Sequence, residues 1–82
     1  MRRDREGEEM TRMDLSRTQL EILIHEWITG KNAERDRAIL ARRLFDGITY
    51  ERIAEEFEMS PRQIRTIVHA GEARIYSHIP GL

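Results

Sequence analysis

The segment M-S-P-R-Q-I at residues 59–64 defines the start of a helix, and no other feature constrains the fold as strongly. Ser60 is a preferred N-cap residue, and the proline that follows it suits the first helical position. Gln63 stands at the third helical position, where its side chain can bond back to the backbone of the cap. We therefore expect a helix over residues 61–77.

Three further helices are expected from cap residues and apolar spacing, at about residues 17–29, 33–46 and 49–57. Ser16 with Gln19 repeats the capping box, and Asn32 and Thr49 are the candidate caps of the other two helices. No segment alternates apolar and polar residues with the period of a strand. The sequence predicts an all-α fold: a small four-helix domain that contains a helix-turn-helix at residues 49–77.

Apolar residues at helical spacing predict the core of the first two helices: Leu20, Leu23, Ile24, Trp27 and Ile28, then Ala33, Leu40, Ala41 and Leu44. Ile22 falls outside this stripe. Together with Trp27 it is predicted to form a partner interface on the first helix. Trp27 is interpreted as a core residue rather than a platform for a cofactor.

Length and composition limit the classes of function. A chain of 82 residues forms one small domain, expected at 15–82, and lacks room for a second domain with a catalytic cleft. The chain has no cysteine, which excludes disulfides and thiolate zinc sites and favours a cytoplasmic location. No apolar run approaches the roughly 18 residues of a membrane span, so no membrane partner is expected. Residues 1–14 mix both charge signs and predict a mobile tail.

The net charge of −1 does not by itself indicate a nucleic-acid binder. The distribution is more informative, because only residues 59–82 are net positive, with Arg62, Arg65 and Arg74 against Glu72. On a helical wheel, Ile64, Ile67, Val68, Gly71 and Ile75 share one face, within about 60° of Ile64. The opposite face carries Arg62, Arg65, Thr66 and His69.

The polar face fits a recognition helix, whose first two turns enter the major groove of DNA. Arg62 and Arg65 can each donate two hydrogen bonds to a guanine, and Thr66 and His69 can reach base edges or phosphates. Gln63 can either close the capping box or pair with adenine. Thr49 and Tyr50 are placed to meet phosphate at the start of the third helix. Arg35 and Arg42 are further candidates for phosphate contacts, although an exposed helix also carries arginine for solubility alone.

The stretch DGITYERIAEEFEMSPRQIRTIVHAGEARI resembles region 4 of sigma-70 family transcription factors, and the resemblance spans roughly residues 33–79. Its most specific parts are the D-G-x-T-Y-E-x-I-A junction and the M-S-P-R-Q-I helix start. The resemblance implies promoter DNA and RNA polymerase as partners. It places Arg62, Gln63, Arg65 and Thr66 at base-reading positions, with phosphate contacts at Thr49, Tyr50 and Arg35. The chain looks like a stand-alone region 4 without the DNA-melting region 2, and LuxR-type regulators share the helix arrangement.

An enzyme and a protein-interaction module are the two classes of function that compete with DNA binding. H-E-W-I-T at residues 25–29 begins like the zinc-protease motif H-E-x-x-H but has Thr29 in place of the second histidine. With His25, His69 and His78 scattered, neither a metal site nor an enzyme is expected, and no cofactor is implied. The remaining alternatives are a protein-interaction adaptor, as a homodimer or a polymerase-docking module, and a phage terminase small-subunit-like DNA-binding protein that forms rings.

Overall fold

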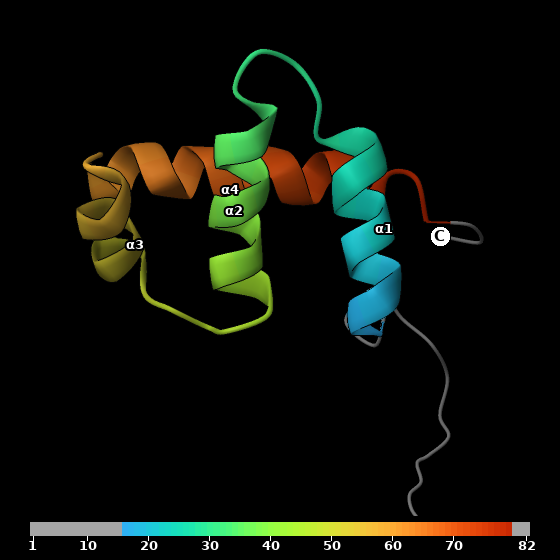
Figure 1. The fold of residues 1–82 in the computed structure, drawn as a ribbon, viewed down its shortest axis with the longest axis horizontal. Coiled ribbons are helices and arrows are strands. Elements are labelled where there is room, and N and C mark those ends of the chain that lie inside the picture. The colour runs from blue at the N-terminus through green and yellow to red at the C-terminus, as the bar shows by residue number, and fades with distance from the viewer. Residues whose placement is uncertain (1–15, 80–82) are drawn as a thin grey trace, which may run out of the picture.

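The computed structural model describes residues 16–79, and within them the chain forms four helices and no strand. The helices are α1 (Arg17–Trp27), α2 (Ala33–Leu44), α3 (Tyr50–Phe57) and α4 (Pro61–Tyr76) (Figure 1). The predicted all-α, four-helix class is therefore confirmed. The predicted mobile tail at residues 1–14 lies outside the described residues.

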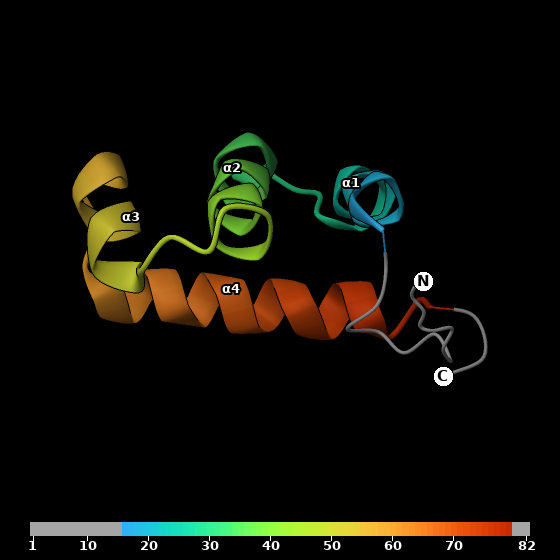
Figure 2. The same ribbon diagram turned by 90° about the horizontal axis from the view of Figure 1, so that it is seen from below.

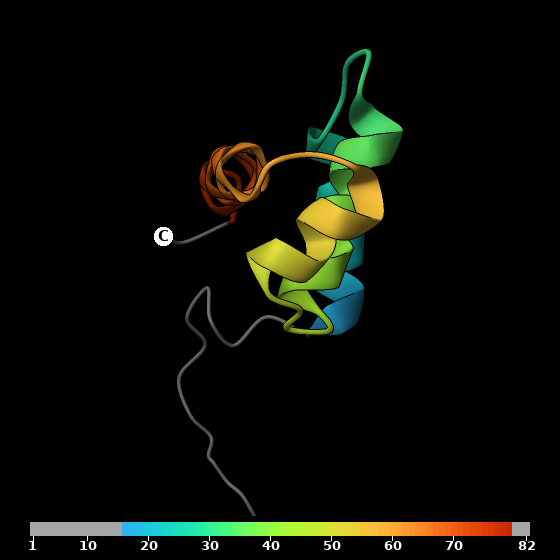
Figure 3. The same ribbon diagram turned by 90° about the vertical axis from the view of Figure 1, so that its left-hand side faces the viewer.

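The longest helix, α4, lies across one side of the other three. Figure 2 shows α1, α2 and α3 in a row, with α4 running along one side of that row. Figure 3 looks along α4 and shows the other three helices on the same side of it. α4 contacts each of them, with α3 near its start and α1 near its end. Within the described residues, the face of α4 that is turned away from the row has no helix over it.

The core lies between α4 and the row of three helices. Its buried hydrophobic residues are Ile24, Ile28, Ile39, Leu40, Ile53, Ala54, Ile64, Val68 and Ile75. The sequence did not predict Ile39, which is fully buried beside its neighbour Leu40. α2 contacts α1, α3 and α4. A helix with neighbours on several sides buries a wider arc than a single apolar stripe, so both adjacent residues are covered.

Gly71 lets α2 come close to α4. A Cβ atom at this position would lie 2.7 Å from Cδ1 and 3.2 Å from Cγ of Leu40, which is fully buried. Glycine therefore stands in the middle of α4, despite its low helix propensity, where the two helices pack most tightly.

Side-chain caps fix the starts of three helices. At α4, the Gln63 N–H donates to Ser60 Oγ (3.1 Å), and the Ser60 N–H donates to Gln63 Oε1 (2.9 Å). Ser16 and Gln19 form the same reciprocal pair at α1. Thr49 caps α3 by accepting from the N–H of Arg52 at 3.2 Å. These predicted caps are confirmed, because each depends only on residues three apart in the chain.

The end of α1 is held by two arginines from other helices. Arg37 of α2 donates to the carbonyl oxygens of Ile28 and His25, both at 2.9 Å. Arg74 of α4 donates to the carbonyl oxygen of Trp27 at 3.3 Å. The last carbonyls of a helix have no partner within it, and cations are favourable at that end. The two guanidinium groups therefore fasten α1 to the rest of the fold.

Some local predictions are wrong, including the end of α2, which lies at Leu44 rather than residue 46. Asn32 precedes α2 but makes no side-chain cap hydrogen bond. α1 ends at Trp27 rather than residue 29, because Ile28 has an extended backbone (φ −94°, ψ 98°) and its carbonyl accepts from Arg37. Trp27 is 37% exposed rather than buried in the core. It lies at the edge of α1, where its ring stacks on His78 with 3.6 Å between ring centroids.

Replacing Ser60 by alanine tests the cap that starts α4. The Ser60→Ala variant should lose about 0.5–2 kcal/mol of unfolding free energy, because the N–H of Gln63 loses its acceptor. Thr18→Ala is the control, since Thr18 is exposed in α1, and it should change the value by less than about 0.5 kcal/mol. Urea denaturation measures both variants. Equal midpoints for Ser60→Ala and the parent would contradict the role of the cap.

Candidate nucleic-acid interface

The polar face of α4 is exposed along the first half of the helix. All five predicted base-reading residues are exposed: Arg62, Gln63, Arg65, Thr66 and His69. The residues between them that point to the core are buried, namely Ile64 and Val68. The capping box at Ser60 fixes where this face begins, so the first two turns present their side chains to solvent at defined angles.

On one flank of this face, a cluster forms around the ring of Tyr50, the first residue of α3. The guanidinium carbon of Arg43 lies 4.5 Å from the ring centroid, and that of Arg65 lies 5.5 Å from it. His69 meets the same ring edge-on, with 6.5 Å between ring centroids. Distances of this size allow cation–π attraction. Tyr50 thus holds one cation from α2 and one from α4 beside the start of α3.

Arg43 belongs to this flank although the sequence did not indicate it. Its guanidinium donates to the carbonyl oxygen of Ile48 at 3.1 Å, across the connection between α2 and α3. This contact depends on the path of the connection, which turns at Gly47, a residue with a positive φ of 64°. Nothing in the sequence pointed to Arg43 beyond its place next to Arg42, which is the predicted phosphate contact.

Arg42 points to a different part of the surface. Its guanidinium meets the carboxylate of Glu56 on α3, with N–O distances of 2.6, 3.0 and 3.1 Å. This side-chain hydrogen bonding is the main cause that lowers the pKa of Glu56 and raises the pKa of Arg42. Arg42 lines neither the Tyr50 cluster nor the hollow on the other flank of α4.

On the other flank of α4, residues of α2 and α4 line a surface hollow of about 380 Å³. Its lining contains Arg35, Met59, Arg62, Gln63, Thr66 and Ile67. Arg35, predicted as a phosphate contact, thus lies beside three predicted base-reading residues. Its guanidinium also pairs with the neighbouring Asp36 at 3.0 Å, and both side chains remain partly exposed.

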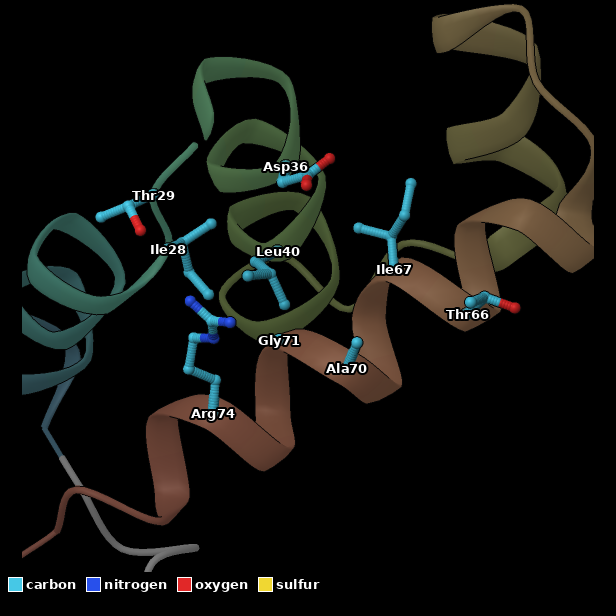
Figure 4. Close-up of a pocket in the computed structure, with 9 residues that line it drawn as sticks. All are labelled: Ile28, Thr29, Asp36, Leu40, Thr66, Ile67, Ala70, Gly71 and Arg74. Atoms are coloured by element: carbon cyan, nitrogen blue, oxygen red, sulfur yellow. The ribbon is translucent and has the colours of Figure 1, made fainter. Parts of the chain in front are cut away.

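A second hollow, of about 250 Å³, continues along the same side of α4 and shares Thr66 and Ile67 with the first. Figure 4 shows Leu40 and Ile28 on one wall and Gly71 and Ala70 on the other. The lining is mainly apolar, and the Arg74 side chain extends toward the end of α1 (Figure 4). Since that guanidinium donates to the Trp27 carbonyl, Arg74 serves the packing of α1.

Two further predicted positions have clear surroundings. Thr49 is exposed, and its hydroxyl oxygen accepts from the Arg52 N–H, which leaves the hydroxyl hydrogen free to donate. On α1, Ile22 is 52% exposed, while Trp27 is partly covered by His78. α1 lies near the far end of α4, so these two residues are separate from the polar face (Figure 2).

Between residues 16 and 79, no three His, Asp or Glu side chains gather as they would around a metal ion. No helix in that range has the length and apolar character needed to cross a membrane.

The chain matches no model of a known protein family, no curated protein and no solved structure. The resemblance to sigma region 4 therefore stays a prediction from the quoted residues.

The ion pair between Arg42 and Glu56 predicts a pH dependence of stability. Because the folded state lowers the pKa of Glu56, the pair stabilises the fold at pH values above the ordinary glutamate pKa of 4.5. This contribution disappears as the pH falls through the pKa of Glu56 in the folded state. A double-mutant cycle of Arg42→Ala and Glu56→Ala tests this, with urea denaturation as the measure of unfolding free energy. The two substitutions should show a coupling energy at about pH 7 and none at about pH 2. Coupling of the same size at both pH values would contradict this account.

Proposed function

We propose that the protein is a DNA-binding transcriptional regulator with a sigma region 4-like helix-turn-helix formed by α3 and α4. α4 is the recognition helix, and it reads duplex DNA in the major groove. The observation that carries this proposal is the exposed row of donors, Arg62, Arg65 and Thr66, on a helix whose start is fixed by a capping box. The proposed role is binding rather than catalysis, in the cytoplasm.

The packing of α4 supports this role. A recognition helix must present one face without obstruction. In the part of the chain that the structure describes, the other helices cover only the opposite face of α4. Arg62 and Arg65 lie in the first two turns, the part that enters the groove in helix-turn-helix proteins. Each guanidinium can donate two hydrogen bonds to O6 and N7 of a guanine.

Phosphate contacts are proposed on both flanks of α4. Arg43, Tyr50 and Thr49 lie on the α3 side, and Arg35 lies on the α2 side. Cations on the two flanks of a recognition helix fit the two phosphate backbones that border the major groove. Arg42 is left out of this set, because its guanidinium meets Glu56 and it neither contacts the Tyr50 ring nor lines the hollow.

A protein-interaction role through α1 is the second candidate, and the exposure of Ile22 favours it. The two roles are compatible, because α1 lies away from the polar face. A single helix-turn-helix buries little surface on DNA, so pairing with a second copy or docking on RNA polymerase would raise its occupancy through effective concentration.

Selection from a random duplex DNA library, repeated over a series of salt concentrations, tests the proposal. We expect one enriched site and a steep loss of affinity as the salt concentration rises. In a plot of the logarithm of the binding constant against the logarithm of the salt concentration, the slope should be about −0.9 for each phosphate neutralised. If no site is enriched and the affinity does not change with salt concentration, the DNA-binding role is rejected.

Replacing Arg65 by alanine tests the recognition helix itself. Arg65→Ala should weaken binding to the enriched site by roughly 5- to 150-fold, and binding to random DNA much less, because a base-specific contact is lost. Lys31→Ala removes the same charge from the exposed connection between α1 and α2, and it should preserve the ratio of specific to random affinity. Fluorescence anisotropy measures both ratios. If Arg65→Ala and the parent have the same ratio of specific to random affinity, Arg65 does not contact the bases.

A further inference from the structure

The capping box fixes the orientation of the Gln63 side-chain amide. The atom that faces the backbone nitrogen of Ser60, at 2.9 Å, is Oε1. The Ser60 N–H can only donate, so only the oxygen end of the amide can satisfy it. At the same time the Ser60 hydroxyl accepts from the Gln63 N–H. Turning the amide over would break one bond of the reciprocal pair and leave two donors facing each other.

The nitrogen end of the amide is therefore the end that a ligand meets. Gln63 is exposed and lines the hollow beside Arg62 and Thr66. No described residue accepts a hydrogen bond from the Gln63 Nε2 group. An amide nitrogen carries two N–H donors and no acceptor. Although a free glutamine can turn either end of its amide to a ligand, Gln63 in this position turns its Nε2 donors outward, because Oε1 faces the Ser60 N–H.

The major groove distinguishes bases by this property. At position 6 of a purine or position 4 of a pyrimidine, guanine O6 and thymine O4 accept hydrogen bonds, whereas adenine N6 and cytosine N4 donate. N7 accepts in both purines and does not distinguish them, so an N–H donor selects a keto base only where it meets position 6 or 4. The usual pairing of glutamine with adenine needs the amide oxygen and nitrogen to face the same base edge. With the oxygen turned to Ser60, that arrangement is closed to Gln63.

We infer that Gln63 is a specificity-determining residue that selects a keto base, guanine or thymine, at one position of the bound DNA. This inference rests on the proposed function, since it assumes that α4 enters the major groove. Arg62 lines the same hollow as Gln63 and is also a pure donor. This side of α4 therefore presents two neighbouring donors, which fit neighbouring acceptors on DNA.

The substitution Gln63→Glu separates the cap from the reading of the base. A glutamate at this position still accepts from the Ser60 N–H, as in the usual capping box, and a negative charge is favourable at a helix start. Its outer group, however, is an acceptor instead of a donor. The variant should melt no lower than the parent, which shows that the helix start is intact.

The experiment compares sites selected by the parent and by Gln63→Glu from the same random duplex library. At one position, a roughly tenfold preference of the parent for guanine or thymine should reverse to adenine or cytosine in the variant. Overall affinity should also fall, because the added negative charge repels phosphate. Gln19→Glu is the matched control, since Gln19 closes the same box on α1. It should leave every base preference unchanged.

The outcomes separate this inference from the proposed function. If the parent selects no DNA site, the proposed function fails and the reading of a base by Gln63 fails with it. If the parent selects a site but Gln63→Glu keeps every preference, the inference on Gln63 is overturned and the DNA-binding role stands. Adenine or cytosine in the parent's site, at the position that changes in the variant, would also overturn the inference.

Discussion

The reciprocal hydrogen bonds between Ser60 and Gln63 are the interaction on which the proposed reading surface depends. They set the first residue of α4, and every later side chain on that helix follows at about 100° per residue. One interaction between residues three apart thus fixes where the helix begins, while the packing of Ile64, Val68 and Ile75 decides which face is buried. The bond from the Ser60 N–H to Gln63 Oε1 also turns the amide nitrogen of Gln63 toward solvent. One hydrogen bond therefore both stabilises the helix start and sets the group that Gln63 presents to a ligand.

Within residues 16–79, the other helices hold α4 in place without covering its polar face. α1, α2 and α3 all pack on one side of it, and Gly71 allows α2 to approach closely. Arg37 and Arg74 fasten the end of α1, while the Tyr50 ring gathers Arg43 and Arg65 beside α3. Arg37 and Arg74 therefore serve the packing of α1, whereas Arg65 stays exposed near the start of α4.

Features set by neighbours in the chain could be predicted, and features set by packing could not. The caps at Ser60 and Thr49 follow from short spacings, and the structure has both. The burial of Ile39 depends on α2 lying between two other helices, which one sequence does not reveal. The partner of Arg42 lies fourteen residues away on α3, so the sequence could not separate a paired arginine from one free to bind phosphate.

An NMR titration of the amide signals with duplex DNA tests the central claim most directly. If α4 reads the major groove, the signals that shift should come from residues 60–69, with further shifts at Arg35, Arg43 and Tyr50. The signals of α1 around Ile22 should stay in place. Shifts confined to α1, or an unchanged spectrum with the duplex in excess, would contradict the account.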